Sequence, residues 1–367
     1  MYCTNCGAKV ENGSSFCTNC GKCLKNGNEN KKKYIIGGIA GGVILFFIVV
    51  LAVFFNSSGY YFSNSSYSDN VKNNNQMNGY KTVIVYDNQY YGVDINNDND
   101  ARKLIIEDSV KQKNICSEEI KQIENEFISK FNITAVNLCE MDLGFARELE
   151  SVFEKIYSVF PNTKGYITNL TLRNVSSAAE IAAFMPAFPF ATSNSNDSYP
   201  WVFKTQVLLS SNYFLNKDKL KYAVEDGSNT GHFPPNATIY SPIAHELGHY
   251  ISFLALIKHY SYDYVLMWNS QNINDFSTIM TDWKKGIFSL QMLNEAYENY
   301  KNDTNTSLSF DEFRRTISGY ALSKDENGEY IYDETIAEAF HDVYLNDSNA
   351  CDASKYIVNV LNKYLNK

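Results

Sequence analysis

The feature that most constrains this chain is an uncharged run of 22 residues, Tyr34 to Phe55, which reads YIIGGIAGGVILFFIVVLAVFF. At a rise of about 1.5 Å per residue, a helix of this length crosses the hydrocarbon core of a bilayer, which is about 30 Å thick. The run is too long and too far from the N-terminus to be the core of a signal peptide. It therefore predicts one transmembrane helix at 34–55 and a chain divided between two compartments.

The charges around this run predict its orientation. Three lysines at 31–33 precede it, and no Lys or Arg follows until Lys72. Because positively charged flanks stay on the cytoplasmic side, we expect the N-terminus inside the cell and the C-terminal part outside, as the ectodomain of a single-pass protein of the cell membrane. Residues 56–79, rich in Asn, Ser and Tyr, are typical of a flexible stalk.

Composition limits what the ectodomain binds. Six Lys and two Glu give residues 1–33 a charge of +4. Because the net charge of the whole chain is −9, the remaining residues carry −13. Nucleic-acid binding depends on a basic surface that neutralises phosphates, and we therefore expect no nucleic-acid partner for the ectodomain. With 44% hydrophobic and 14% aromatic residues, the chain has ample material for a packed core.

The cysteines fall into two groups. Two identical CTNCG sequences lie near the N-terminus, and they supply four thiols at a spacing that suits one tetrahedral metal ion: Cys3, Cys6, Cys17 and Cys20. This pattern predicts a structural zinc ribbon at 1–30, with iron in a rubredoxin-like site as the alternative. We expect the ribbon to fold on its metal and to dock a cytoplasmic partner. The pairing of Cys116, Cys139 and Cys351 stays open.

The periodicity of the remaining residues predicts an α+β fold for the ectodomain. Strands are expected at 81–86, 166–173 and 205–210, and helices at 117–131, 143–160, 241–260, 286–301, 334–345 and 354–365. The C-terminal half is mostly helical. We therefore divide the ectodomain into an N-terminal α+β part at 80–200 and a mostly helical part at 201–367, which contains the candidate catalytic motif described next.

The sequence HELGH at 245–249 carries the chemistry of the ectodomain. On a helix, His245 and His249 lie four residues apart and project from one face toward a single zinc ion. Glu246 lies beside that metal and suits a general base that moves a proton between water and a leaving amine. The motif therefore predicts a catalytic zinc with these two histidines as ligands.

The residues around the motif favour this interpretation. Ser241 is a suitable N-cap, and Pro242 suits the first helical position. The predicted strand at 205–210 precedes the helix, and we expect it to be an edge strand that binds an extended peptide.

A catalytic zinc needs a third protein ligand and an open position. The pattern Glu334-x-x-x-Glu338 offers two carboxylates on one helical face, one to bind zinc and one to accept a hydrogen bond from a ligating imidazole. Which carboxylate has which role stays open, and Glu295 and Glu298 are the next candidates for the ligand. His259 fits no ligand spacing.

These motifs resemble a known family. HELGH followed by ETIAEAF is similar to the gluzincin zinc metallopeptidases of the anthrax-lethal-factor-like and Pro-Pro endopeptidase group, over about residues 200–345. The resemblance implies a zincin-like fold. It implies zinc bound by His245, His249 and Glu334, with Glu246 as the general base and Glu338 behind a ligating histidine.

The family also has a tyrosine seven residues before the third ligand, which assists catalysis by stabilising the oxyanion. Here that position is Asn327, whereas Ser318-Gly319-Tyr320-Ala321 resembles the family's S-x-Y-A element, as if about seven residues had been inserted before the ligand. The resemblance therefore favours Tyr320, with Tyr330 and Tyr332 as alternatives.

Together these features predict a membrane-anchored zinc endopeptidase, with one catalytic and one structural zinc ion. It would hydrolyse peptide bonds of extracytoplasmic proteins or peptides by zinc-activated water. Two alternatives stay open: a non-catalytic surface-binding or sensor protein with a structural zinc site, and a zinc hydrolase of cell-wall peptides. The presence of Glu246 favours an enzyme, because a structural site needs no carboxylate beside its ligands.

Overall fold

The computed structural model describes residues 9–10, 82–86, 89–93, 116–173, 181–193, 201–260, 267–268 and 273–366. The predicted membrane helix at 34–55 and the stalk at 56–79 lie outside these ranges, as does the zinc ribbon at 1–30 apart from Lys9 and Val10. Within the described ranges, no helix is both long and apolar enough to span a membrane.

The strands form one mixed sheet with the order β2-β1-β5-β6-β4-β3, and β7 pairs with β6. The strands are β1 Thr82–Tyr86, β2 Gln89–Val93, β3 Ala135–Asn137, β4 Asn169–Arg173, β5 Ala182–Ser193, β6 Trp201–Ser210 and β7 Met267–Trp268. β3, β4 and β6 run parallel, whereas β5 is antiparallel to β6 and β1. Val207, Leu208 and Leu209 of β6 are all buried, which is typical of a strand covered on both faces.

The predicted strands at 81–86, 166–173 and 205–210 are confirmed as β1, β4 and β6, but the expectation that 205–210 is an edge strand is wrong. β6 lies inside the sheet, where it pairs with β5 on one side and with β4 on the other. The strand beside the HELGH helix is β5 instead. β5 and β6 also pair across the expected boundary at 200/201, so the two parts expected at 80–200 and 201–367 contribute to one sheet.

Helices dominate the second half of the described chain, and all the predicted helices are confirmed. The α-helices are α4 Glu118–Phe131, α5 Leu143–Val159, α6 Ser211–Phe214, α7 Lys217–Asn229, α8 Ser241–His259, α9 Ile273–Lys285, α10 Ile287–Thr304, α11 Phe310–Arg315, α12 Tyr332–Asn346 and α13 Asp352–Leu365. The 3-10 helices are η2 Pro161–Thr163, η3 Tyr320–Leu322 and η4 Asp347–Asn349. The chain is thus a mixed α+β protein, mostly helical, with a small sheet.

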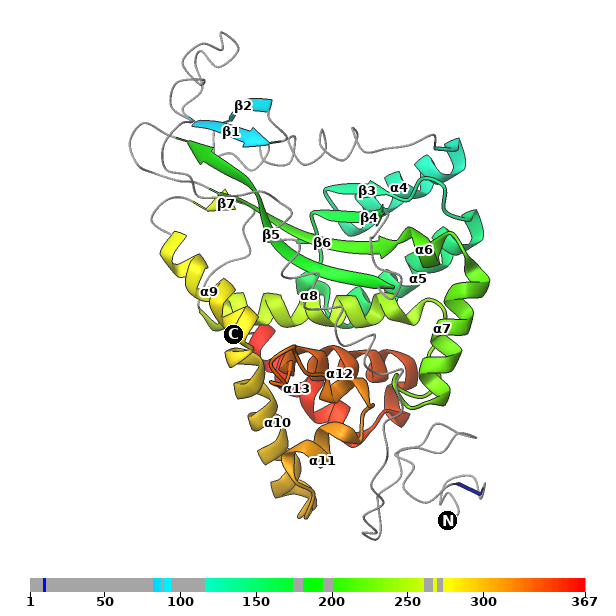
Figure 1. Ribbon diagram of the computed structural model, residues 1–367, viewed down its shortest axis with the longest axis vertical. Coiled ribbons are helices and arrows are strands. Elements are labelled where there is room, and N and C mark those ends of the chain that lie inside the picture. The colour runs from blue at the N-terminus through cyan, green and yellow to red at the C-terminus, as the bar shows by residue number, and fades with distance from the viewer. Residues whose placement is uncertain are drawn as a thin grey trace.

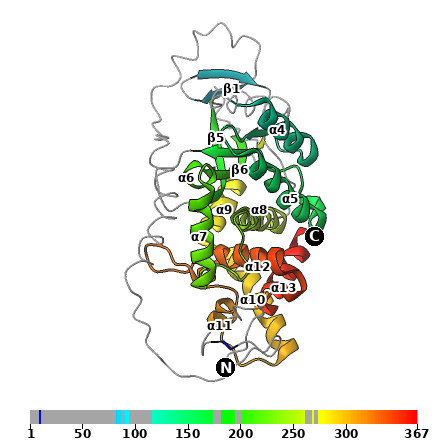
Figure 2. The same ribbon diagram turned by 90° about the vertical axis from the view of Figure 1, so that its right-hand side faces the viewer.

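Helix α8 occupies the centre of the described structure. It runs between the sheet and the pair α12 and α13 in Figure 1, and Figure 2 shows it end-on between the same layers. Every residue from Ser241 to Ile257 is buried, because β5 packs against one side of the helix and α12 and α13 against another. The HELGH motif therefore lies on the most enclosed of the helices that the structure describes.

Two local details of α8 determine how it packs. Its N-cap is Tyr240, so Ser241 is the first helical residue and not the cap, and its hydroxyl instead bonds to the backbone of Thr238. At Gly248, a Cβ atom would lie 3.0 Å from the Cα of Ala337 and 3.0 Å from the Cβ of Phe340. A residue without a side chain therefore lets α12 approach the motif closely.

Helix α4 begins where the sequence predicts a helix, at residues 117–118. The Ser117 side chain accepts a hydrogen bond from the amide of Ile120, and acidic residues follow in the first turn. Cys116, directly before this cap, forms a disulfide with Cys139 after β3. This pairing resolves one of the alternatives left open by the sequence and links α4 to the end of β3.

Candidate metal centre

The two histidines of the motif meet as their spacing predicts. One helical turn separates them on α8, and their Nε2 atoms lie 3.1 Å apart. Their side chains are 7% and 9% exposed, so the pair is enclosed in the protein. Because α8 is helical over its full length, this geometry follows from four-residue spacing alone.

A third potential metal-binding atom, beside the two histidine Nε2 atoms, comes from helix α12. Glu334 Oε2 lies 3.1 Å from His245 Nε2 and 3.3 Å from His249 Nε2. Two imidazole nitrogens and a carboxylate oxygen thus converge on one point from two helices, and this donor set suits zinc. Of the two carboxylates that the sequence left open, the structure brings Glu334 to the shared side of both rings.

The other nitrogen of each ring faces a second carboxylate. Nδ1 of His245 lies 2.8 Å from Glu338 Oε1, and Nδ1 of His249 contacts Asp333 Oδ2. A carboxylate that accepts a hydrogen bond from Nδ1–H orients the ring and leaves the Nε2 lone pair free to bind a metal. Both rings are therefore held with Nε2 directed at Glu334, and the residues present fit a zinc ion there.

Asp333 is the site residue that the sequence did not reveal. Its Oδ1 accepts hydrogen bonds from Ser252 Oγ at 2.7 Å and Ser289 Oγ at 3.2 Å, so side chains of α8 and α10 hold it in place. Asp333 directly precedes Glu334, and neighbouring residues of a helix point in different directions. No helical spacing therefore signals that both carboxylates serve one site.

Buried opposite charges dominate the electrostatics of this cluster. Burial opposes protonation of His245, but its hydrogen bonds to Glu334 and Glu338 outweigh this effect and raise its pKa to about 9. The pKa of His249 is also raised well above its usual value, because Glu334 and Asp333 outweigh its burial. Burial would raise the pKa of Glu334, yet the two histidines lower it to about 2. The carboxylate is therefore ionised and available to a cation.

Glu246 lies next to His245 on α8 and is also buried. Its Oε2 accepts a hydrogen bond of 2.6 Å from the backbone N–H of Phe184 on β5. Burial raises the pKa of Glu246, against the lowering influence of the two histidines. A raised carboxyl pKa brings the group closer to the range in which general bases work.

Tyr320, on η3, is 9% exposed and packs at the same cluster. Its ring centre lies 5.6 Å from that of His245 and 4.8 Å from that of His232, a residue that the sequence did not single out. Burial, together with Glu334 and the neighbouring carboxylates, raises the pKa of Tyr320 well above its usual value. Its hydroxyl therefore stays protonated and can donate a hydrogen bond.

The alternative candidates lie elsewhere. Tyr330 donates to Asp311 Oδ2 at 2.8 Å, and both Tyr330 and Tyr332 pack against Arg314. On α10, Glu295 accepts a hydrogen bond of 2.6 Å from Lys363, and Glu298 is exposed. The structure therefore does not bring any of these four candidates into the histidine cluster.

A second group of potential metal ligands shares His245. It consists of His245, Glu338 and His341, and His341 Nδ1 lies 3.3 Å from Glu338 Oε1. Glu338 also accepts a 2.5 Å hydrogen bond from Ser318 Oγ through Oε2. Because Glu338 is already engaged by three side chains, this group is better suited to orienting His245 than to binding an ion of its own.

Comparison with known proteins assigns the other metal module. The family model of the zinc-ribbon domain matches residues 2–22, a segment that contains Cys3, Cys6, Cys17 and Cys20. Residues 2–22 are a zinc ribbon. No curated protein and no solved structure matches the chain. The zinc-binding character of the N-terminal module thus follows from its family, whereas the case for a metal site at the HELGH cluster depends on its geometry alone.

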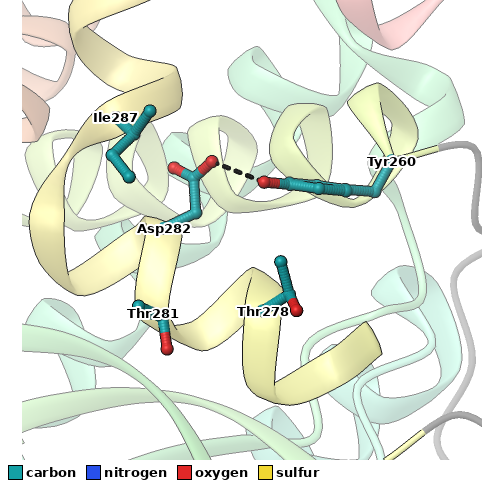
Figure 3. Close-up of a pocket in the computed structure, with 5 residues that line it drawn as sticks. All are labelled: Tyr260, Thr278, Thr281, Asp282 and Ile287. Atoms are coloured by element: carbon teal, nitrogen blue, oxygen red, sulfur yellow. Dashed lines mark hydrogen bonds between the residues drawn. The ribbon is translucent and has the colours of Figure 1, made fainter. Parts of the chain in front are cut away.

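A pocket of about 210 Å³ lies at the C-terminal end of α8, and Figure 3 shows the residues that line it: Tyr260, Thr278, Thr281, Asp282 and Ile287. The Asp282 carboxylate accepts hydrogen bonds of 2.8 Å from the Tyr260 hydroxyl and from the backbone N–H of Phe288. Asp282 therefore joins the end of α8 to α9 and α10. None of the proposed zinc ligands lines this pocket.

Proposed function

We propose that this protein is a membrane-anchored, zinc-dependent endopeptidase with a zincin-like ectodomain, which hydrolyses peptide bonds of extracytoplasmic proteins or peptides. The observation that carries this proposal is the convergence of His245, His249 and Glu334, with Glu246 adjacent on the same helix. Zinc bound there would polarise the scissile carbonyl and make an attacking water more acidic.

In this mechanism the proton moves through Glu246. Its buried carboxylate would accept a proton from the attacking water and deliver it to the leaving amine. The hydrogen bond from Phe184 N–H holds this carboxylate beside the cluster. The raised pKa of Glu246 suits a group that must both accept and return a proton.

Tyr320 would stabilise the negative charge that develops on the scissile carbonyl oxygen. Its hydroxyl stays protonated because burial raises its pKa, and its ring packs beside His245. A donor held in place before the reaction stabilises an oxyanion more strongly than mobile water does.

The edge of β5 that faces away from β6 is the most suitable place for an extended substrate. The bond from Ser210 N–H to Ile181 O sets the ladder to β6 so that the backbone of Ala182, Phe184 and Pro186 faces away from β6. β1 pairs with β5 only at residues 191–193, so within the described chain no strand pairs with the edge at 182–186. Pro186 faces this edge without disrupting the ladder. Because Phe184 N–H on this edge already donates to Glu246 Oε2, a peptide that adds there as another strand must pair beside that bond or displace it.

The membrane anchor and the extracytoplasmic location rest on the sequence at 31–55 and on one structural feature. The disulfide between Cys116 and Cys139 is typical of proteins in oxidising compartments. Protease added to intact cells should digest residues beyond about 56 and leave residues 1–33 protected. The reverse pattern would place the proposed peptidase in the cytoplasm.

The activity can be tested on the full chain purified in detergent. We expect metal analysis to find two zinc ions per chain, one in the ribbon and one at His245, and a quenched fluorescent peptide library to contain cleaved members. Glu246→Gln is the matched control, because it should retain both ions and cleave the library at least about 100-fold more slowly. Two zinc ions without cleavage of any peptide would instead indicate a structural site.

A further inference from the structure

Arg314, on α11, is the largest of the fully buried side chains that the structure describes, with 0% exposure. Its guanidinium carbon lies 4.4 Å from the ring centre of Tyr330, 4.9 Å from that of Tyr332 and 5.5 Å from that of Phe310. A charge removed from water is costly unless it is well paired. The buried guanidinium therefore needs hydrogen-bond partners, and it finds them at Thr335 and at the carbonyl of Ala321.

Arg314 links the segment that bears Tyr320 to the helix that bears Glu334. One terminal nitrogen donates to the carbonyl of Ala321 at 3.0 Å, and Nε donates to Thr335 Oγ1 at 2.9 Å. The Thr335 hydroxyl also donates to the Ala321 carbonyl at 2.6 Å. The other terminal nitrogen bonds to Asp311 at 3.3 Å. The rigid fork of a guanidinium is well suited to fixing two elements relative to each other.

The same segment is fixed from its other side. Tyr320 N–H donates to the carbonyl of His232 at 3.1 Å, and Gly319 N–H donates to that of Gly231 at 2.7 Å. Ser318 accepts a hydrogen bond from Ala321 N–H at 3.1 Å and donates to Glu338. The backbone of η3 is therefore held between the 231–232 loop and Arg314, with the Tyr320 ring directed at the metal cluster.

A hairpin explains why the aromatic residues surround Arg314. Between η3 and α12 the chain folds back on itself, with a 2.9 Å bond from Ile331 N–H to Ser323 O and a bridge between Lys324 and Tyr330. Asn327 lies exposed in the turn of this hairpin. The hairpin thus carries position 327 away from the cluster and returns the chain so that Tyr330 and Tyr332 pack against Arg314.

We propose that Arg314 is a positioning residue for Tyr320: through Ala321 and Thr335 it sets the place of the Tyr320 hydroxyl relative to the metal cluster. This inference rests on the proposed peptidase function, and it adds a residue on α11, outside the two metal-bearing helices, on which turnover depends. Arg314 would act on turnover without touching the substrate or the zinc ion.

The test compares Arg314→Lys with Arg315→Lys in the full chain, with a peptide found in the library as the probe. Arg315 is the matched control because it is adjacent on α11 and exposed. Arg314→Lys keeps the charge but loses the fork, and we expect kcat to fall about 100-fold, with KM nearly constant and zinc content retained. Arg315→Lys should leave kcat unchanged.

A double-mutant cycle with Tyr320→Phe separates positioning from a general effect on the fold. If Arg314 acts through the Tyr320 hydroxyl, Arg314→Lys should lower kcat little further once that hydroxyl is gone. Thr335→Val, which retains Arg314, should reproduce the loss in part and covers the case in which Arg314→Lys fails to fold. The proposal is overturned if the two losses multiply fully in the double mutant, or if both Arg314→Lys and Thr335→Val retain wild-type kcat.

A second readout does not depend on peptide cleavage. With 3-fluorotyrosine incorporated at position 320, Arg314→Lys should shift or broaden the ¹⁹F resonance, whereas Arg315→Lys should leave it in place. An unchanged resonance in Arg314→Lys overturns the positioning role. If the wild-type chain cleaves no peptide while this resonance responds to Arg314→Lys, the proposed reaction fails and the structural coupling stands.

Discussion

Helices α8 and α12 serve one cluster of side chains by different means. α8 contributes His245 and His249 from adjacent turns of one helix, so their relation is local and independent of the rest of the fold. α12 contributes Glu334, which lies 89 residues after His245, and its place depends on how the two helices pack. A short motif thus specifies two of the three candidate ligands, whereas the position of the third depends on tertiary contacts.

The two helices also differ in what holds their side chains. The histidines are oriented by carboxylates of α12, through Glu338 and Asp333. Those carboxylates are oriented in turn by hydroxyls outside α12, including Ser318 and Ser252. Loss of a proposed ligand on either helix should therefore remove the site outright, whereas loss of a group that only orients a ligand should weaken it by degrees.

The largest effect is expected from the three proposed ligands. His245→Ala, His249→Ala and Glu334→Ala should each abolish binding of the catalytic zinc and all cleavage, because each removes one of three donor atoms. Metal analysis should then find only the ion of the ribbon. If Glu334→Ala retains its zinc while Glu338→Ala loses it, the roles of the two carboxylates are exchanged.

Next in size is the loss of the general base. Glu246→Gln should lower kcat by about 100- to 10,000-fold, because the amide keeps the shape of the side chain but cannot carry the proton. Zinc content and thermal stability should be nearly unchanged. Turnover at the wild-type rate would exclude Glu246 from proton transfer and leave α8 with a purely metal-binding role.

Loss of the outer carboxylates should have a smaller effect. Asp333→Ala and Glu338→Ala should each weaken zinc affinity or activity by about 10- to 100-fold, as is typical of groups that orient a ligating histidine. Glu326→Ala, an exposed carboxylate of the hairpin, is the control and should be neutral. Competition with a zinc chelator measures the affinities, and a neutral Asp333→Ala would show that His249 needs no such partner.

The contact between the two helices can be tested at Gly248. Gly248→Ala places a Cβ atom 3.0 Å from Ala337 and Phe340, so we expect α12 to be pushed outward. The free energy of unfolding should fall by about 1–3 kcal/mol, and zinc affinity should fall with it. Gly144→Ala, at an exposed position where a Cβ atom would meet only the Asp142 side chain, is the control. Equal stability of both variants would contradict the close approach.

The smallest expected effect is a pH dependence of the zinc-free protein. Its pKa of about 9 means that His245 binds a proton more tightly in the folded state than in the unfolded state, where the pKa is about 6.5. The resulting stabilisation is fully present below about pH 6.5 and is lost as the pH rises through 9. Thermal unfolding after chelation should show a lower midpoint at pH 9.5 than at pH 6. His245→Ala should show a smaller dependence, to which His249, whose pKa is also raised, still contributes.

Much of the coarse fold was predictable, because helices and strands depend on local periodicity. The predicted helices and strands are present, and the α+β class is confirmed with its helical second half. The position of 205–210 within the sheet was not predictable, because strand order depends on pairing partners far away in the chain. β5 faces the cluster instead, and only the ladder to β6 reveals which of its amides point outward.

The sequence by itself determined the zinc ribbon at 2–22 and the spacing of His245, Glu246 and His249, because neighbouring cysteines on a turn and one helical turn are local relations. Only the tertiary structure brought Glu334 rather than Glu338 to the shared side of both rings, and only it revealed Asp333. The physical reason is that these contacts depend on the distance and rotation between two helices. Those quantities are decided by close packing at Gly248 and by the elements that surround α12, and no single stretch of sequence encodes them.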